Sequence, residues 1–233
     1  MFPEKLKTAK NTQFHGKNTQ HGFQKSKSTV NASFAFLNEA LNAIDSKEHI
    51  SAIFLDLSNA SDVISHNILL KELESVGTRG PAHEWLKSYL QNREQVAVLP
   101  MQEGNKIKYY CSEKHSVLQD SILGPILFLL FVNDLDPTSP HHNYIKFADD
   151  TIVMIKERTR EELLHEIKKC TTHITDGFSV NNLVINTEKT VTMHLHIVEN
   201  KYPLIRDIEL FSRAFENVSS TKLHGILIQE DQR

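Results

Sequence analysis

Four consecutive apolar residues, Ala52 to Leu55, stand directly before an aspartate. A strand without polar alternation is typical of a sheet that is covered on both faces, so this segment predicts a central strand with helices on each side. An ionised carboxylate at the end of such a strand is costly to bury without a partner. Asp56 is therefore a candidate functional residue, and an ordinary strand-end or capping role is the alternative for this residue taken alone.

Two more aspartates, Asp149 and Asp150, lie between the apolar segments 144–147 and 151–155, which predict a hairpin around them. Two-residue hairpin loops usually contain glycine because their central residues take positive φ, so two adjacent carboxylates make a poor turn. If the hairpin neighbours the strand that ends at Asp56, three carboxylates meet at one sheet edge. Oxygen ligands suit Mg²⁺, and two such ions can position the reacting oxygens of a phosphoryl transfer. A solvated turn is the alternative for Asp149 and Asp150, and the spacing does not decide between the two.

The remaining segments predict a mixed chain without a repeat. Helices are expected over 29–44, 62–76, 84–90, 121–132 and 160–178, and strands over 95–99, 107–111, 184–185, 191–195, 208–211 and 223–228. The 233 residues, of which 39% are apolar and 24% charged, suffice for one globular domain or two small ones. The longest apolar run, 122–132, is far shorter than the roughly 20 residues that a bilayer crossing needs, so no membrane partner is expected.

Charge is distributed unevenly along the chain. The first 29 residues hold six lysines and one acidic residue, whereas the whole chain has a net charge of −3. This pattern predicts a basic, disordered leader over 1–19 and argues against a protein that coats nucleic acid through bulk charge. Cys111 and Cys170 lie far apart, and no apolar stretch with a cleavage site opens the chain. We therefore expect an intracellular location, with no distinction between nucleus and cytoplasm.

Three segments carry a resemblance to a known family. Residues 54–62, FLDLSNASD, resemble the first carboxylate motif of reverse transcriptases from LINE-type (non-LTR) retrotransposons, particularly jockey-like elements. Residues 121–128, followed by 132–135, resemble the helix of that family that contacts template and nucleotide. Residues 147–151, FADDT, match the second carboxylate motif without a change.

Three weaker matches complete the series in the family's order. Gln20, Gly22-Phe23 and Ser28-Thr29 resemble the fingers motif that opens the domain. Residues 181–190 match the segment with a lysine thought to assist the departure of pyrophosphate, and residues 222–226 resemble the primer-grip hairpin. Six motifs in order, over residues 20 to about 230, are far more specific than any one of them.

The resemblance implies an α+β, right-hand polymerase fold. Fingers and palm would form one domain over 20–230, with an antiparallel palm sheet backed by helices and with the thumb absent. The implied function is RNA-directed DNA polymerase, which uses two Mg²⁺ ions, or Mn²⁺, to extend a DNA primer on an RNA template from deoxynucleoside triphosphates. The oligomeric state is not indicated.

The resemblance also assigns roles to individual residues. Asp56, Asp149 and Asp150 would be the catalytic residues and the metal ligands. At the nucleotide site, the Leu57 carbonyl would help Asp56 to hold the metal ions, and residue 61 would lie at the sugar. Gln119 would lie beside the nucleotide and template, and Lys189 near the pyrophosphate. The set of nucleotide-binding residues is therefore Leu57, Ser61, Gln119 and Lys189.

Several positions depart from the family's pattern. Ser61 replaces an aromatic residue, Asp120 a glycine, Gly177 a tryptophan and His224 a leucine. These changes, together with the missing thumb and endonuclease, predict a truncated, partly decayed element of reduced activity. The alternative is a catalytically dead remnant with at most weak nucleic-acid binding. The only tryptophan, Trp85, is expected to anchor a core between fingers and palm.

Overall fold

The structure is a computed structural model that describes residues 19–57, 64–91, 95–99, 108–112, 121, 123–132, 139, 141–180, 183–195, 209–210, 213–214 and 216–229. The chain divides into two compact units, of which the first covers 1–13 and 61–131 and the second covers 14–60 and 132–233. The predicted leader over 1–19 lies almost entirely outside the described residues. The boundary between that leader and a domain over 20–230 therefore stays a prediction.

A five-stranded sheet forms the centre of the second unit. Its strands are β1 (His49–Leu55), β4 (His142–Phe147), β5 (Asp150–Glu157), β6 (Val191–Leu195) and β9 (Glu216–Asn217), in the order β4-β5-β1-β6-β9. Neighbouring strands are antiparallel except for β6 and β9, which are parallel. The central strand is β1, as the continuous apolar run before Asp56 predicts.

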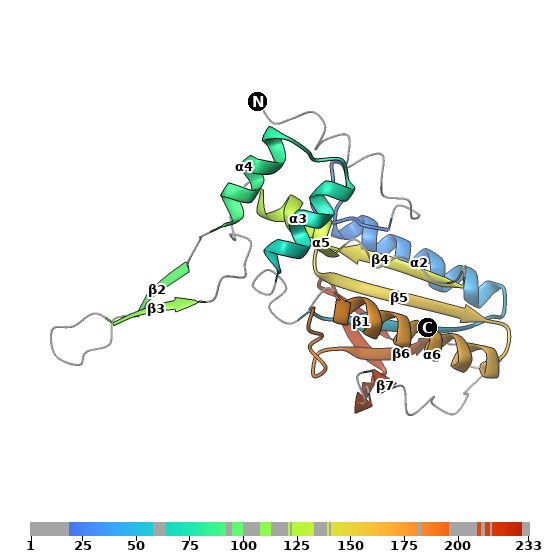
Figure 1. Cartoon of the computed structure of the whole chain (residues 1–233). Coiled ribbons are helices and arrows are strands. Elements are labelled where there is room, and N and C mark those ends of the chain that lie inside the picture. Colours follow the sequence, from blue (N-terminus) through green and yellow to red (C-terminus); the bar gives the residue numbers. More distant parts are fainter. Residues whose placement is uncertain are drawn as a thin grey trace. The chain divides into compact units, whose positions relative to one another are not determined.

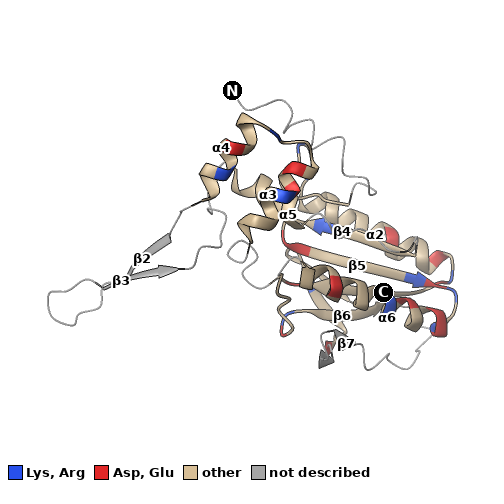
Figure 2. Ribbon diagram, viewed as in Figure 1, with Lys and Arg blue, Asp and Glu red and all other residues tan. Residues whose placement is uncertain are grey.

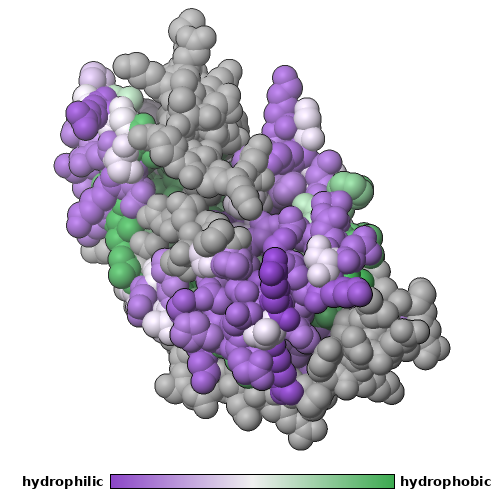
Figure 3. Space-filling view, turned by 90° about the vertical axis from the view of Figure 1, so that its right-hand side faces the viewer, coloured by the Kyte–Doolittle hydropathy of each residue, from purple (hydrophilic) through white to green (hydrophobic). Residues whose placement is uncertain are grey.

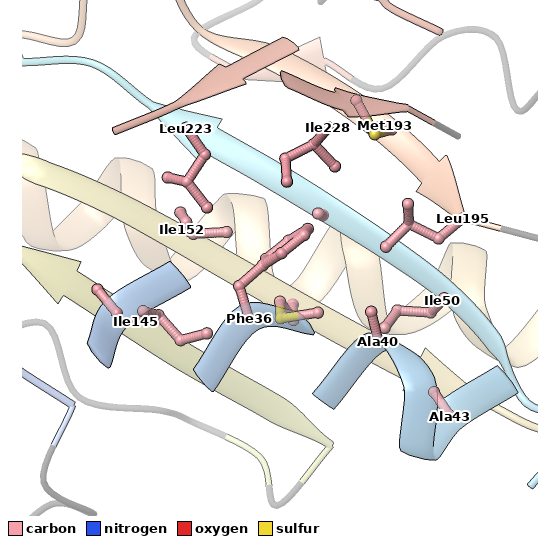
Figure 4. Packing of buried hydrophobic residues seen from close by; sticks show 13 residues of the cluster. Phe36, Ala40, Ala43, Ile50, Ile145, Ile152, Met193, Leu195, Leu223 and Ile228 are labelled. Carbon is pink, nitrogen blue, oxygen red and sulfur yellow. The ribbon is translucent and has the colours of Figure 1, made fainter. Parts of the chain in front are cut away.

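Two helices cover opposite faces of this sheet (Figure 1). The helices are α2 (Thr29–Asp45) and α6 (Arg160–Val180). Figure 4 shows Phe36 and Ala40 of α2 against Ile50 and Ile152 of the sheet, with α6 behind the strands. On the other face the hydroxyl oxygen of Tyr144 in β4 lies 3.7 Å from Sγ of Cys170 in α6. The expectation of a strand covered on both faces is confirmed.

The start of α2 is determined locally. Ser28 precedes the helix in an extended conformation, and its backbone N–H donates to Asn31 Oδ1 at 2.9 Å. This bond satisfies one of the N–H groups that a helix start leaves without a partner. Ala32, Phe36, Ala40 and Ala43 then recur at helical spacing on the buried face. The predicted helix over 29–44 is confirmed.

Short hairpins complete the second unit. They are β10 (Ser220–Leu223) with β11 (Ile226–Gln229), and β7 (Glu209–Leu210) with β8 (Arg213–Ala214). The prediction of one strand over 223–228 is wrong, because the chain turns at His224-Gly225. Both turn residues have positive φ, 48° and 87°, which is the requirement of a tight hairpin turn.

The first unit contains α3 (His66–Ser75), α4 (Pro81–Leu90), most of α5 (Gly124–Val132) and a hairpin of β2 (Gln95–Leu99) and β3 (Lys108–Ser112). The predicted core role of Trp85 is wrong. Its side chain is 57% exposed and stacks on Tyr89 with ring centroids 5.8 Å apart. The helix buries Leu86 and Leu90 instead, and residues at 85 and 89 lie on the adjacent stripe.

The described surface is mainly hydrophilic. In Figure 3 most of the coloured residues on the face shown are hydrophilic, with smaller hydrophobic groups among them. Figure 2 shows both signs of charge on β5, acidic at its start and basic near its end. None of the described helices has the length and apolar character needed to cross a membrane.

The buried thiol of Cys170 should be inert in the folded protein. Burial raises its pKa to about 11, and the residue is fully buried in α6. Only a thiolate reacts quickly with disulfide reagents. In a Cys111→Ser variant, Ellman's reagent at pH 8 should label Cys170 many times more slowly than in the same protein in urea. Equal rates in the two conditions would contradict this packing.

Candidate active site

The register of β1 and β5 brings two of the predicted carboxylates together. Leu55 pairs with Thr151 at the end of the ladder, so Asp56 and Asp150 lie opposite each other one position further on. Residues opposite each other in neighbouring antiparallel strands have Cβ atoms roughly 5 Å apart. Asp149 directly precedes Asp150 at the hairpin turn. The structure thus brings Asp56, Asp149 and Asp150 together at one end of the strands, which is called the carboxylate edge of the sheet below.

The hairpin turn differs from the prediction by one residue. Phe147 pairs with Asp150, so the turn residues are Ala148 and Asp149, and Asp150 is the first residue of β5. Ala148 has a φ of 56°, a left-handed conformation that an alanine adopts at a cost. The prediction of a turn around Asp149 and Asp150 therefore placed it one residue too late, and the strained position is the alanine.

The electrostatics of the edge are unfavourable without a cation. Burial raises the pKa of the Asp150 carboxyl, the charge on Asp149 raises it further, His224 partly offsets the rise, and the charge on Asp56 adds a smaller increase. Burial would raise the pKa of an isolated carboxyl too. The contributions of the Asp149 and Asp56 charges, by contrast, exist only if the three carboxylates are near one another. A bound divalent cation would reverse the sign of the local potential.

A histidine of the β10–β11 turn lies beside this edge. Nε2 of His224 is 3.8 Å from Oδ2 of Asp150, and Nδ1 is 3.3 Å from the Ser33 hydroxyl oxygen. The ring also makes an edge contact with Phe147, with centroids 5.1 Å apart. Burial lowers the pKa of His224, and Asp150 only partly offsets that effect. Sequence comparison singled out His224 as a departure from the family but gave no hint of its contact with Asp150.

Asp56 is held by the segment that follows α6. Its backbone N–H donates to the Thr190 hydroxyl at 3.2 Å, and its carbonyl accepts the Asn186 N–H at 2.9 Å. Nζ of Lys189 lies 4.0 Å from Oδ2 of Asp56. The lysine is largely exposed, so the pair contributes little to stability. Its effect is to place one positive charge beside the carboxylates.

The other predicted nucleotide contacts are only partly described. Leu57 is buried and forms a bridge with Ile185, one residue beyond Asp56. Leu57 and Lys189 therefore flank the carboxylate edge. Ser61 and Gln119 lie outside the described residues, and their predicted roles at the sugar and beside the template stay predictions.

The donor set fits Mg²⁺ in chemistry. Carboxylate oxygens are the ligands that this hard cation prefers, and a cation would relieve the repulsion among the carboxylates. In the part of the chain that the structure describes, no group of three or more His, Cys, Asp or Glu is arranged closely enough to hold a metal. The three aspartates are therefore neighbours at one edge without forming a closed ligand cage, and the metal assignment stays a prediction.

Comparison with known proteins gives a consistent result. The family model described as "Reverse transcriptase (RNA-dependent DNA polymerase)" matches residues 4–226. The chain is 25% identical over 218 residues to the "Probable RNA-directed DNA polymerase from transposon BS" of Drosophila melanogaster, covering 91% of this chain and 23% of that protein. It is 30% identical over 152 residues to the RNA-directed DNA polymerase from mobile element jockey of the same species, covering 60% and 16%. The chain thus spans less than a quarter of the length of these relatives.

Solved structures show the same fold. Telomerase from Candida tropicalis, truncated from its C-terminal domain, aligns over 97% of this chain and 42% of its own with a TM-score of 0.61 and 14% identity. Telomerase from Candida albicans with a fragment of telomeric RNA aligns over 97% and 35% with a TM-score of 0.57 and 13% identity. The predicted right-hand polymerase fold and the resemblance to jockey-like elements are confirmed, and the chain belongs to the reverse transcriptase family.

Proposed function

We propose that this chain is the polymerase domain of an RNA-directed DNA polymerase that works by two-metal nucleotidyl transfer. The observation that carries the proposal is the meeting of Asp56, Asp149 and Asp150 at one edge of a five-stranded sheet in a member of the reverse transcriptase family. The partners would be an RNA template, a DNA primer and deoxynucleoside triphosphates, in an intracellular compartment.

The reaction assigns a task to each part of the edge. The primer's 3′ hydroxyl would lose its proton to solvent as its oxygen attacks the α-phosphorus of the incoming nucleotide. The bond between that phosphorus and the oxygen bridging to the β-phosphorus would break, and pyrophosphate would leave. Mg²⁺ ions would be held by Asp56, Asp149 and Asp150 and would neutralise charge on the attacking and leaving oxygens. Lys189 would supply a positive charge toward the pyrophosphate. The Leu57 carbonyl, next to Asp56, would assist the metal site.

Primer extension tests the proposal directly. A labelled DNA primer annealed to an RNA template should be extended by the chain with deoxynucleoside triphosphates and Mg²⁺. A version with both Asp149→Asn and Asp150→Asn should give no product. We expect slow turnover, because His224 contacts Asp150 and because Asp120 and Ser61 replace family residues. If the chain is folded and yields no product with Mg²⁺ or Mn²⁺, the chain is the dead remnant and the proposed activity is wrong.

Metal binding should be visible as a gain in stability. A ligand that binds only the folded state stabilises it by about 2.7 kcal/mol at one hundred times its Kd. For a chain of this size each kcal/mol raises Tm by roughly 2 to 4 °C. Saturating Mg²⁺ should therefore raise Tm by about 5 to 10 °C, measured by differential scanning fluorimetry. The change Asp56→Asn with Asp149→Asn should remove the shift, and an unaltered shift would contradict the assignment.

A further inference from the structure

A glutamine from the first described segment reaches the turn that carries the catalytic aspartates. Gln20 is 3% exposed and lies 128 positions before Ala148 in the sequence. Its Oε1 accepts the Ala148 N–H at 3.1 Å and the Gly22 N–H at 2.7 Å, and its Nε2 donates to the Ala148 carbonyl at 3.5 Å. One side-chain amide therefore pairs with both backbone groups of Ala148.

The backbone around Gln20 is also tied to the hairpin. The Lys146 N–H donates to the Thr19 carbonyl at 2.8 Å, and the His21 N–H donates to the Lys146 carbonyl at 2.7 Å. Gln20 and Lys146 thus form a parallel bridge at the outer side of β4, the edge strand of the sheet. The Lys27 ammonium donates to the Gln20 carbonyl at 3.1 Å and holds the segment from its other side.

Gly22 makes the close approach possible. A Cβ at this position would lie 2.2 Å from the Ala148 nitrogen and 2.9 Å from its Cα. Both atoms belong to the backbone of the hairpin turn, so the neighbour cannot move aside as the end of a side chain could. Any residue other than glycine would push the segment away from the turn and break the amide contacts of Gln20.

Ala148 needs these contacts because of its conformation. With a φ of 56° it is one of five described non-glycine residues with positive φ. A left-handed alanine persists only where the surroundings determine it, and here Gln20 binds its N–H and its carbonyl at once. The orientation of the peptide after Ala148 determines the position and direction of the Asp149 backbone. Asp150, the next residue, is the first residue of β5.

We infer that Gln20, with Gly22, is a positioning device for the catalytic carboxylates, which fixes the left-handed turn at Ala148 and thereby aims Asp149. Gln20 touches neither substrate nor metal in this role and acts through the turn. The inference rests on the proposed polymerase function for its kinetic consequence. The hydrogen bonds between the Gln20 side chain and Ala148, called the clamp below, are a structural property that can be measured without turnover.

The structural arm of the test uses hydrogen exchange. In the variant Gln20→Met, which keeps the length of the side chain and removes both polar atoms, the amide of Ala148 should exchange at least about tenfold faster than in the unchanged chain. The amides of Ile53 and Val153 in the centre of the sheet should keep their protection. Gln24→Met makes the same chemical change in the same loop, outside the clamp, and should leave Ala148 unchanged. Unaltered exchange at Ala148 in the Gln20→Met variant would overturn the inference whether or not the chain polymerises.

The kinetic arm measures kcat and KM for primer extension. A displacement of catalytic groups by about 1 Å can cost roughly a hundredfold in rate. Gln20→Met should therefore lower kcat by about a hundredfold, with KM for the primer–template within twofold, and Gln24→Met should change neither. Gln20→Glu keeps the acceptor for the two N–H groups and should recover part of kcat. An active parent with unchanged kcat in Gln20→Met would overturn the inference and leave the proposed function standing. An inactive parent would overturn the proposed function, and the exchange arm would then decide the clamp alone.

Discussion

Changing Asp149 to asparagine should lower the rate of RNA-templated primer extension by roughly a thousandfold. Asparagine has nearly the same size as aspartate but has no charge with which to hold a divalent cation. Metal ions supply several kcal/mol of charge stabilisation in phosphoryl transfer, and about 4 kcal/mol corresponds to three orders of magnitude in rate. Single-turnover extension at saturating Mg²⁺ measures this loss without a contribution from product release.

Unfolding should not contribute to this loss. A carboxyl whose pKa is raised by folding destabilises the folded state at neutral pH, and the charge on Asp149 contributes to the raised pKa of Asp150. Removing that charge relieves Asp150, so the Asp149→Asn protein without metal should be at least as stable at pH 7 as the parent. A thermal melt of both proteins without divalent cations checks this point.

Glu188→Gln is a matched control for the same chemical change. Glu188 is exposed in the turn next to Lys189, and its backbone N–H donates to Asn186 Oδ1 at 3.2 Å. The variant loses one carboxylate near the site but none of the three at the sheet edge. Its extension rate should stay within about twofold of the parent. If Glu188→Gln and Asp149→Asn lose activity equally, net charge near the site and not metal ligation is responsible.

The central part of the fold could be predicted because its signals are local. An unbroken apolar run such as Ala52 to Leu55 is a property of adjacent residues, and it identified the strand that has helices on both faces. The carboxylates at its end and in the hairpin were found in the same way. Their adjacency does not follow from local signals, since the register of β1 and β5 depends on residues about 100 positions apart.

The details that sequence reasoning missed depend on long-range contacts. The turn at Ala148 was displaced by one residue because alanine has no local preference for positive φ, and the contacts that impose it come from Gln20. The expectation of a core role for Trp85 rests on its residue type and on the family-like stretch around it, whereas the helical stripe of Leu86 and Leu90 determines which side is buried. In the sequence His224 is only a departure from the family's pattern. Its position beside Asp150, a long-range contact, follows from the β10–β11 hairpin turn.

Truncating Phe36 to alanine should have the largest effect on stability. Phe36 has no exposed surface and lies at the centre of the core between α2 and the sheet (Figure 4). Its ring centroid is 5.8 Å from that of Phe54. Phe→Ala changes in packed cores cost about 3 to 5 kcal/mol, because the transfer free energy is lost and a cavity remains. At roughly 2 to 4 °C per kcal/mol, Tm should fall by about 6 to 20 °C in a thermal melt followed by circular dichroism.

The same helix supplies the matched control. Phe34 lies two positions earlier and is 68% exposed, so Phe34→Ala removes the same atoms from the surface and should change the free energy of unfolding by no more than about 0.5 kcal/mol. Helix propensity does not separate the two variants, because both replace phenylalanine by alanine within α2. A large difference between them would therefore report burial alone. Equal losses would mean that α2 does not present Phe36 to the sheet, and the arrangement of the core on that face would be wrong.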